Sequence, residues 1–141
     1  EEKTSKVLKI INSKTYYITG DKGKIDEDGF LTIVDRYSRF AKVGGEMISL
    51  GNIEDKISKL IDLEENNLVD FIITTIEDDK KGEKIILLIS HVNEEYISLL
   101  KEKILNSFEN KLMIPSNIKI IDEVPRLGSG KKDFAKAKLL V

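Results

Sequence analysis

Residues 68–90 read LVDFIITTIEDDKKGEKIILLIS and decide the fold of this chain. Two apolar, β-prone runs, Leu68–Ile76 and Ile85–Ser90, flank the polar segment Glu77–Gly82. A short polar connection between two such runs predicts a pair of strands joined as a hairpin.

The segments on either side of this hairpin carry helix and strand signals. Ser49 is expected to cap a helix whose apolar stripe consists of Ile53, Ile57, Leu60 and Ile61. Asn93 is expected to cap a second helix, with Ile97, Leu100, Ile104 and Phe108 on one side. A third strand is predicted over residues 117–121 and a short helix over residues 133–139. This order predicts an α+β fold with a small three-stranded sheet and helices.

A short β unit precedes this layer. Residues 16–19 and 30–34 are β-prone, and turn-forming residues lie between them. Residues 35–39 are polar and lack a period, which indicates a linker. The predicted division is a β unit over residues 1–35, a hinge over residues 36–39 and an α+β domain over residues 40–141.

Composition excludes several classes of function. The 141 residues are 40% hydrophobic and 34% charged, which is typical of a folded chain, and no apolar run is long enough for a membrane span. The chain has no cysteine and a single histidine, His91, so we expect no disulfide scaffold, thiol catalysis or zinc site, and no metal ligands. The formal net charge of −2 argues against nucleic-acid binding.

Asp21 is the first candidate for a chemical role. It follows the β-prone residues 17–19, and a carboxylate beyond a strand end can accept hydrogen bonds from two ribose hydroxyls. An ordinary turn aspartate is the alternative.

Two glycine-containing segments are the other candidates. Gly44-Gly45 can adopt positive φ or admit a ligand close to the backbone, although a plain turn before a helix is the alternative. Lys131 lies on a glycine-rich loop, from which a lysine can bring positive charge to a phosphate or carboxylate; a solvated basic tail is the alternative. The loop is not a P-loop, because Pro125 and Lys132 occupy positions that require Gly and Ser or Thr.

In this order, the three segments resemble the C-terminal part of the adenylate-forming acyl-activating enzymes, the AMP-dependent synthetase/ligase superfamily. Residues 17–21 (YITGD) resemble its Tyr-x-Thr-Gly-Asp motif. The run from Arg36 through Lys42 and Gly45 to Glu54 resembles its Gly-Arg-x-Asp-Asp-x-Ile-Lys…Gly…Ile…Glu motif, and residues 125–131 (PRLGSGK) resemble its Pro…Ser-Gly-Lys motif.

Two longer segments are similar to one subgroup of this superfamily. Residues 39–50 (RFAKVGGEMISL) and 127–134 (LGSGKKDF) resemble the acyl-acyl carrier protein synthetase part of bacterial 2-acylglycerophosphoethanolamine acyltransferases. The resemblance implies a ligase that acts in fatty acid and phospholipid metabolism.

The resemblance also implies roles for individual residues. Asp21 would bind the ribose hydroxyls of ATP, and Arg36 would lie beside the ribose and phosphates. Ser38 takes the hinge position, where the family usually has Asp or Lys, so a charge-based hinge mechanism is in doubt here. Gly44 and Gly45 would line the tunnel for the thiol. Lys131 would be the adenylation lysine.

The implied reaction has two halves, which use ATP and Mg²⁺ bound mainly by a large N-terminal adenylating domain. A fatty acid would form an acyl-adenylate, and the acyl group would then pass to the thiol of an acyl carrier protein or CoA. In the subgroup it would go on to a lysophospholipid, on the cytoplasmic side with the full-length protein at the inner membrane. An acidic carrier could dock on basic residues near the loop, which a solvated helix face explains equally well: Arg39, Lys42, Lys56 and Lys59.

Two other functions stay open. The chain could be the C-terminal domain of an acyl-CoA synthetase, or a non-catalytic interaction module derived from this family. By itself the chain is expected to be inactive.

Overall fold

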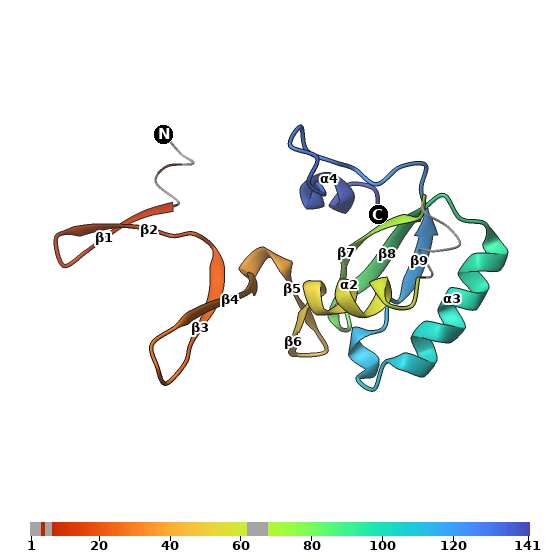
Figure 1. The fold of residues 1–141 in the computed structure, drawn as a ribbon, viewed down its shortest axis with the longest axis horizontal. Coiled ribbons are helices and arrows are strands. Elements are labelled where there is room, and N and C mark those ends of the chain that lie inside the picture. The colour runs from red at the N-terminus through yellow and green to blue at the C-terminus, as the bar shows by residue number, and fades with distance from the viewer. Residues whose placement is uncertain (1–3, 5–6, 62–67) are drawn as a thin grey trace. The chain divides into compact units, whose positions relative to one another are not determined.

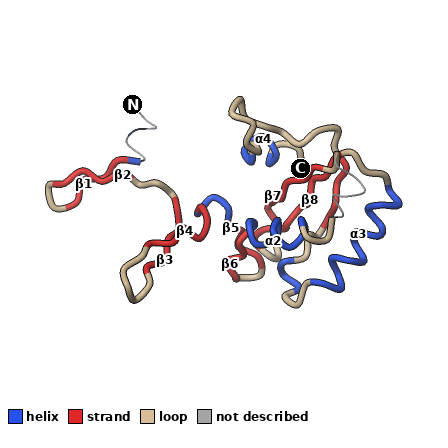
Figure 2. The backbone as a smooth tube through the Cα atoms, in the orientation of Figure 1, coloured by secondary structure: helices blue, strands red, loops and turns tan. Residues whose placement is uncertain are grey.

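The computed structural model describes residues 4, 7–61 and 68–141, which form two compact units, Glu1–Arg39 and Phe40–Val141. From residue 8 onward, the first unit contains two antiparallel hairpins. β1 (Leu8–Ile11) pairs with β2 (Lys14–Tyr17), and β3 (Asp21–Ile25) pairs with β4 (Leu31–Arg36), so strand follows strand along this unit (Figure 2). A 3-10 turn, η1 (Tyr37–Arg39), ends it.

The second unit has a five-stranded sheet at its centre. β7 (Asp70–Asp78) and β8 (Gly82–Ser90) pair in antiparallel register over nine residues each. β9 (Asn117–Ile120) runs parallel to β8, and β5 (Phe40–Val43) meets β8 at Gly82. β6 (Glu46–Ser49) pairs with β5 and completes the sheet.

Helices cover both faces of this sheet (Figure 1). α2 (Leu50–Ser58) and α3 (Glu94–Ser107) bury their apolar stripes in a core that includes Phe71, Ile73 and Leu87. The short α4 (Phe134–Lys138) packs through Ala137 on the opposite face, beside Ile72 and Leu88. The two faces follow from the alternation of side chains along a strand, and burial on both explains why residues 71–73 of β7 and 85–89 of β8 are continuously apolar.

The α+β class and most elements of the second unit agree with the predictions. Ser49 and Asn93 cap α2 and α3 by accepting the amides of Asn52 and Tyr96. The predicted stripe of α3, together with Phe108 just beyond it, is buried. The hairpin connection is shorter than predicted, because Asp78 and Gly82 are already paired within the ladder.

The sheet has two strands more than the predicted three. Gly44 and Gly45 have φ values of 60° and 90° and form a two-residue turn between β5 and β6. Positive φ at both central residues is what a tight type I′ hairpin requires, and glycine adopts it without steric cost. A Gly-Gly pair between two short runs was therefore a hairpin signal.

The first unit also corrects two boundaries. Asp21, which was expected in a turn or loop just past a strand, is itself the first residue of the next strand, β3, and pairs with Arg36 of β4. Asp35 and Arg36, predicted to lie in the linker and hinge, continue β4. That the chain turns about residues 36–39 stays a prediction.

Within the described ranges, no helix combines the length and the apolar character needed to cross a bilayer. The longest, α3, has 14 residues.

The packing of α3 gives a direct test of the core. Leu100 is 2% exposed, and its neighbour Leu99 is 56% exposed. We expect Leu100→Ala to lower the free energy of unfolding by about 2–5 kcal/mol, because a buried cavity remains. Leu99→Ala, the matched control, should change it by less than about 0.5 kcal/mol. Urea unfolding followed by circular dichroism measures both, and equal effects would contradict the placement of α3.

Candidate functional site

Asp21 and Arg36 lie together in the β3–β4 hairpin. They are opposite one another in the strand register, and Arg36 Nε lies 3.1 Å from Asp21 Oδ1. Gly20, with φ of 77°, accepts the amide of Tyr37 at 2.8 Å, and this bond closes the hairpin beside the pair. The structure thus brings both residues of the predicted nucleotide site into one ion pair.

The Gly44-Gly45 turn is held by the β7–β8 hairpin. The amide of Gly44 donates to Lys81 O at 2.8 Å. Glu83 uses both carboxylate oxygens: Oε2 accepts the Lys42 amide of β5, and Oε1 accepts the Thr75 hydroxyl of β7, each at 2.7 Å. An added Cβ on Gly45 would meet no atom within 4 Å, so the tip of this turn is open.

Asp78 organises the turn that Gly44 contacts. Its Oδ1 accepts the amides of Lys80 and Lys81, and its Oδ2 pairs with Lys84. The hydrogen bond from Lys84, with the one from the Lys81 amide next in weight, lowers the pKa of the Asp78 carboxyl below its ordinary value. Asp78 therefore stays ionised at neutral pH and presents Lys81 O to the Gly44 turn.

Lys131 lies on a small hairpin of its own. Arg126 and Lys132 form an isolated antiparallel bridge, and between them the Leu127 amide donates to Lys131 O and the Gly130 amide to Leu127 O, both at 2.8 Å. Lys132 Nζ lies 4.5 Å from the centroid of the Phe71 ring, whereas Lys131 is exposed. The hairpin thus offers the predicted lysine to solvent.

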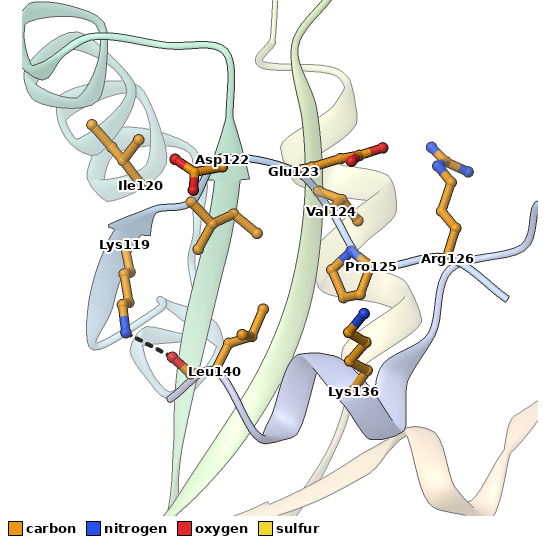
Figure 3. A pocket seen from close by; sticks show the side chains of 10 residues that line it. Lys119, Ile120, Asp122, Glu123, Val124, Pro125, Arg126, Lys136 and Leu140 are labelled. Atoms are coloured by element: carbon orange, nitrogen blue, oxygen red, sulfur yellow. Dashed lines mark hydrogen bonds between the residues drawn. The ribbon is translucent and has the colours of Figure 1, made fainter.

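Arg126 joins this hairpin to the sheet. Its Nη1 donates to Gly130 O at 2.7 Å, and its Nη2 lies 2.6 Å from Asp70 Oδ2 at the start of β7. Figure 3 shows the Arg126 side chain at the end of a pocket of about 620 Å³. The pocket carries charges of both signs, and Lys119 is bonded there to Leu140 O. Lys131 does not line it, so it is not part of the predicted site.

The two loops lie at opposite ends of the β7–β8 hairpin (Figure 1). The Lys131 hairpin is tied to Asp70, the first residue of β7, and the Gly44-Gly45 turn is tied to Lys81, beyond its last residue. At about 3.3 Å per residue, nine residues of strand separate these ends by roughly 26 Å. One ligand cannot contact both loops in a fixed arrangement of this unit.

The remaining predicted residues are spread over the structure. Ser38 is exposed within η1. Lys42, Lys56 and Lys59 are exposed, and Lys56 Nζ lies 5.2 Å from the Phe108 ring centroid. Arg39 is 8% exposed, so the surface available to a carrier consists of the three lysines. Within the described ranges, no cluster of three or more His, Cys, Asp or Glu side chains could hold a metal ion.

Sequence reasoning assigned no individual role to three residues that hold this unit together. Arg126 and Glu83 anchor the two hairpins, and Glu54 of α2 accepts the Ile73 amide of β7 at 3.0 Å. Glu54 is the last residue of the second motif given above, and a usable signal existed for Arg126 as well. It is one of three arginines in a chain with 20 lysines, and the planar guanidinium can serve two partners at once.

Comparison with known proteins identifies related enzymes, although no family model matches the chain. The medium-chain-fatty-acid–CoA ligase of Ectopseudomonas oleovorans is 32% identical over 123 residues, which cover 84% of this chain and 21% of that protein. The 2-succinylbenzoate–CoA ligase of Lactococcus lactis is 34% identical over 119 residues, which cover 83% of this chain and 24% of that protein. The chain thus spans less than a quarter of the length of these relatives.

Solved structures agree on the fold. ATP-bound MatB from Rhodopseudomonas palustris superposes with a TM-score of 0.74 at 21% identity, over 99% of this chain and 26% of that one. The fatty acyl CoA synthetase of Mycobacterium tuberculosis gives a TM-score of 0.62 at 22% identity, over 93% of this chain and 25% of that one. The fold is that of the C-terminal domain of adenylate-forming enzymes. The homologues are acyl-CoA ligases of the AMP-dependent synthetase family, which supports the superfamily to which the motifs pointed.

Glu83 allows a test of how the Gly44-Gly45 turn is held. Glu83→Gln leaves one side-chain oxygen for two donors, so we expect the free energy of unfolding to fall by about 1–3 kcal/mol and the Lys42 amide to exchange faster. Glu77→Gln makes the same change at the exposed residue opposite in the register and should have little effect. Urea unfolding and amide exchange read by NMR compare the two. Equal exchange of the Lys42 amide in both variants would show that the turn does not depend on Glu83.

Proposed function

We propose that this chain is the C-terminal part of an ATP-dependent ligase that converts a carboxylic acid into a thioester through an acyl-adenylate. The observation that carries the proposal is the separation of two functional loops across one rigid sheet. A lysine suited to a developing negative charge lies at one end of β7–β8, and an open glycine turn lies at the other. A reaction with two successive chemical steps could use the lysine in one step and the glycine turn in the other.

The first step needs positive charge. An oxygen of the substrate carboxylate attacks the α-phosphorus of ATP, and pyrophosphate leaves with the electron pair of the broken bond. Lys131 would lie between the carboxylate and the α-phosphate, where it offsets the negative charge that develops in the transition state. Asp21 would accept hydrogen bonds from the ribose hydroxyls, and Arg36, held beside it, would face the phosphates.

The second step needs space. The thiol gives up its proton, its sulfur attacks the acyl carbonyl carbon, and AMP leaves with the electron pair of the broken carbon–oxygen bond. Gly45 has no side chain and nothing within 4 Å of where one would start, so its backbone can border a narrow passage for the thiol arm. Ser38, at the proposed hinge, would let unit 2 turn so that the Gly44-Gly45 loop replaces Lys131 at the reacting atoms.

The exposed surface of unit 1 is evidence for a large N-terminal domain as its partner within the same protein. Two-stranded hairpins are only marginally stable by themselves, and this unit exposes many large apolar side chains that a partner could cover. They include Ile10, Tyr17, Ile25, Phe30, Leu31 and Ile33. We propose that these side chains pack on the large domain and that the 141-residue chain alone forms no acyl-adenylate.

Mg²⁺ is proposed to accompany ATP and to be bound mainly by the large domain. The residues that the structure describes show no side-chain cluster that fits it, so no step above is assigned to the ion.

The acid is proposed to be a fatty acid, and the thiol acceptor has two candidates. Both relatives compared above are named as CoA ligases, which favours CoA. The likeness of residues 39–50 and 127–134 to acyl-acyl carrier protein synthetases favours a carrier protein that feeds lysophospholipid reacylation. The exposed Lys42, Lys56 and Lys59 would suit an acidic carrier.

The two half-reactions separate the roles of the loops in the full-length enzyme. Lys131→Ala should slow ATP–pyrophosphate exchange by about 10²–10³-fold, the usual cost of one preorganised charge stabiliser, and leave transfer from synthetic acyl-adenylate nearly intact. Gly45→Leu should show the opposite pattern, because its side chain fills the proposed thiol passage.

Gly45→Ala is the control for the second variant. It imposes the same unfavourable backbone at φ of 90° without the bulk of leucine, so it should transfer the acyl group better than Gly45→Leu. If folded variants at both positions lose both half-reactions equally, the assignment of one loop to each step is wrong. A wild-type enzyme that catalyses neither step would support a non-catalytic module.

A further inference from the structure

We propose that Arg126 is a positioning residue for Lys131: with Asp70 it forms a clamp that fixes the Lys131 hairpin to the first residue of β7. This inference rests on the function proposed above and adds a residue to it. The term clamp refers here to Arg126, Asp70 and the carbonyl of Gly130.

The clamp acts on the peptide group that carries Lys131. Gly130 O, which accepts from Arg126 Nη1 at 2.7 Å, belongs to the planar peptide whose nitrogen is that of Lys131. On the other side of the same residue, Lys131 O accepts the Leu127 amide at 2.8 Å. Both carbonyls that flank the Lys131 Cα are therefore held, and together they set the direction in which its side chain leaves the backbone.

Asp70 gives the clamp a rigid base. Its Oδ1 accepts the Phe71 amide at 2.9 Å, its backbone oxygen accepts the Ser90 hydroxyl at 3.3 Å, and it is paired in register with Ser90. These bonds leave Asp70 little freedom to follow the loop. The loop must instead follow Asp70, so the central sheet fixes the position of Lys131.

An arginine is needed for this geometry. Arg126 presents Nη1 to one partner and Nη2 to the other from a single planar group, which a lysine ammonium cannot imitate. The Arg126 and Asp70 side chains are 46% and 29% exposed, so water and salt weaken the ion pair. The clamp therefore contributes more to the orientation of one loop than to the stability of the fold.

The test is a double-mutant cycle in the full-length enzyme, with ATP–pyrophosphate exchange as the first readout. Arg126→Ala should lower the exchange rate by about 10- to 100-fold, the scale of misplacing a reacting group by about an ångström. In the Lys131→Ala background, Arg126→Ala should have no further effect, because Arg126 acts only through Lys131. Arg126→Lys should also exchange pyrophosphate more slowly than the wild type. Transfer from synthetic acyl-adenylate should be unchanged in Arg126→Ala, in Arg126→Lys and in the double variant.

Lys119→Ala is the matched control. It likewise truncates a cationic side chain that donates to a backbone oxygen, that of Leu140, and it should leave pyrophosphate exchange at the wild-type rate. Amide exchange of the 141-residue chain gives a second readout: Arg126→Ala should accelerate the Leu127 and Gly130 amides and leave those of β7 and β8 protected.

Two results would overturn the clamp while the proposed function stands. One is an Arg126→Ala enzyme with wild-type exchange, and the other is an Arg126→Ala effect that is undiminished in the Lys131→Ala background. A wild-type enzyme that cannot exchange pyrophosphate would instead overturn the proposed function and this inference with it.

Discussion

The antiparallel pairing of β7 with β8 is the constraint on which the rest of the second unit depends. Nine residues of each strand are in register, from Asp70 opposite Ser90 to Asp78 opposite Gly82. Apolar side chains on one face receive α2 and α3, and those on the other receive α4. The same pairing sets the distance between the two ends of the hairpin, and each end carries one of the loops to which a chemical role is assigned.

Charged side chains attach these two loops to the sheet. Glu83 bonds β5 and β7 at one end, and Arg126 bonds the Lys131 hairpin to Asp70 at the other. Glu54 accepts the Ile73 amide of β7, an edge strand with one side outside the ladder. Hydrogen bonds to charged groups are directional, so they can hold a loop in one orientation where apolar contacts alone would allow several. The two loops are thereby bonded to the same sheet.

Local patterns made much of the second unit predictable. Helical spacing identified the buried side of α3, and Ser49 and Asn93 marked the starts of α2 and α3, because each depends only on neighbours in the sequence. The short strands β5 and β6 were missed, since alternation over four residues is weak and Gly44-Gly45 was interpreted as a loop. Asp21, Arg36 and Lys131 were chosen as candidates through motifs. Glu83 and Arg126 could not be placed, because their partners Lys42 and Asp70 are 41 and 56 residues away.

We propose that unit 2 turns as a rigid body to bring first Lys131 and then Gly45 to the same atoms. The most direct measurement is of distances between spin labels in the full-length enzyme, with other cysteines removed. One pair joins Lys24→Cys to Ser129→Cys beside Lys131, and the other joins Lys24→Cys to Met47→Cys beside Gly45; all three positions are exposed. From the state with ATP and carboxylic acid to the state with a stable acyl-adenylate analogue and thiol, the first distance should increase and the second should decrease. Two distances that are the same in both states would contradict the account.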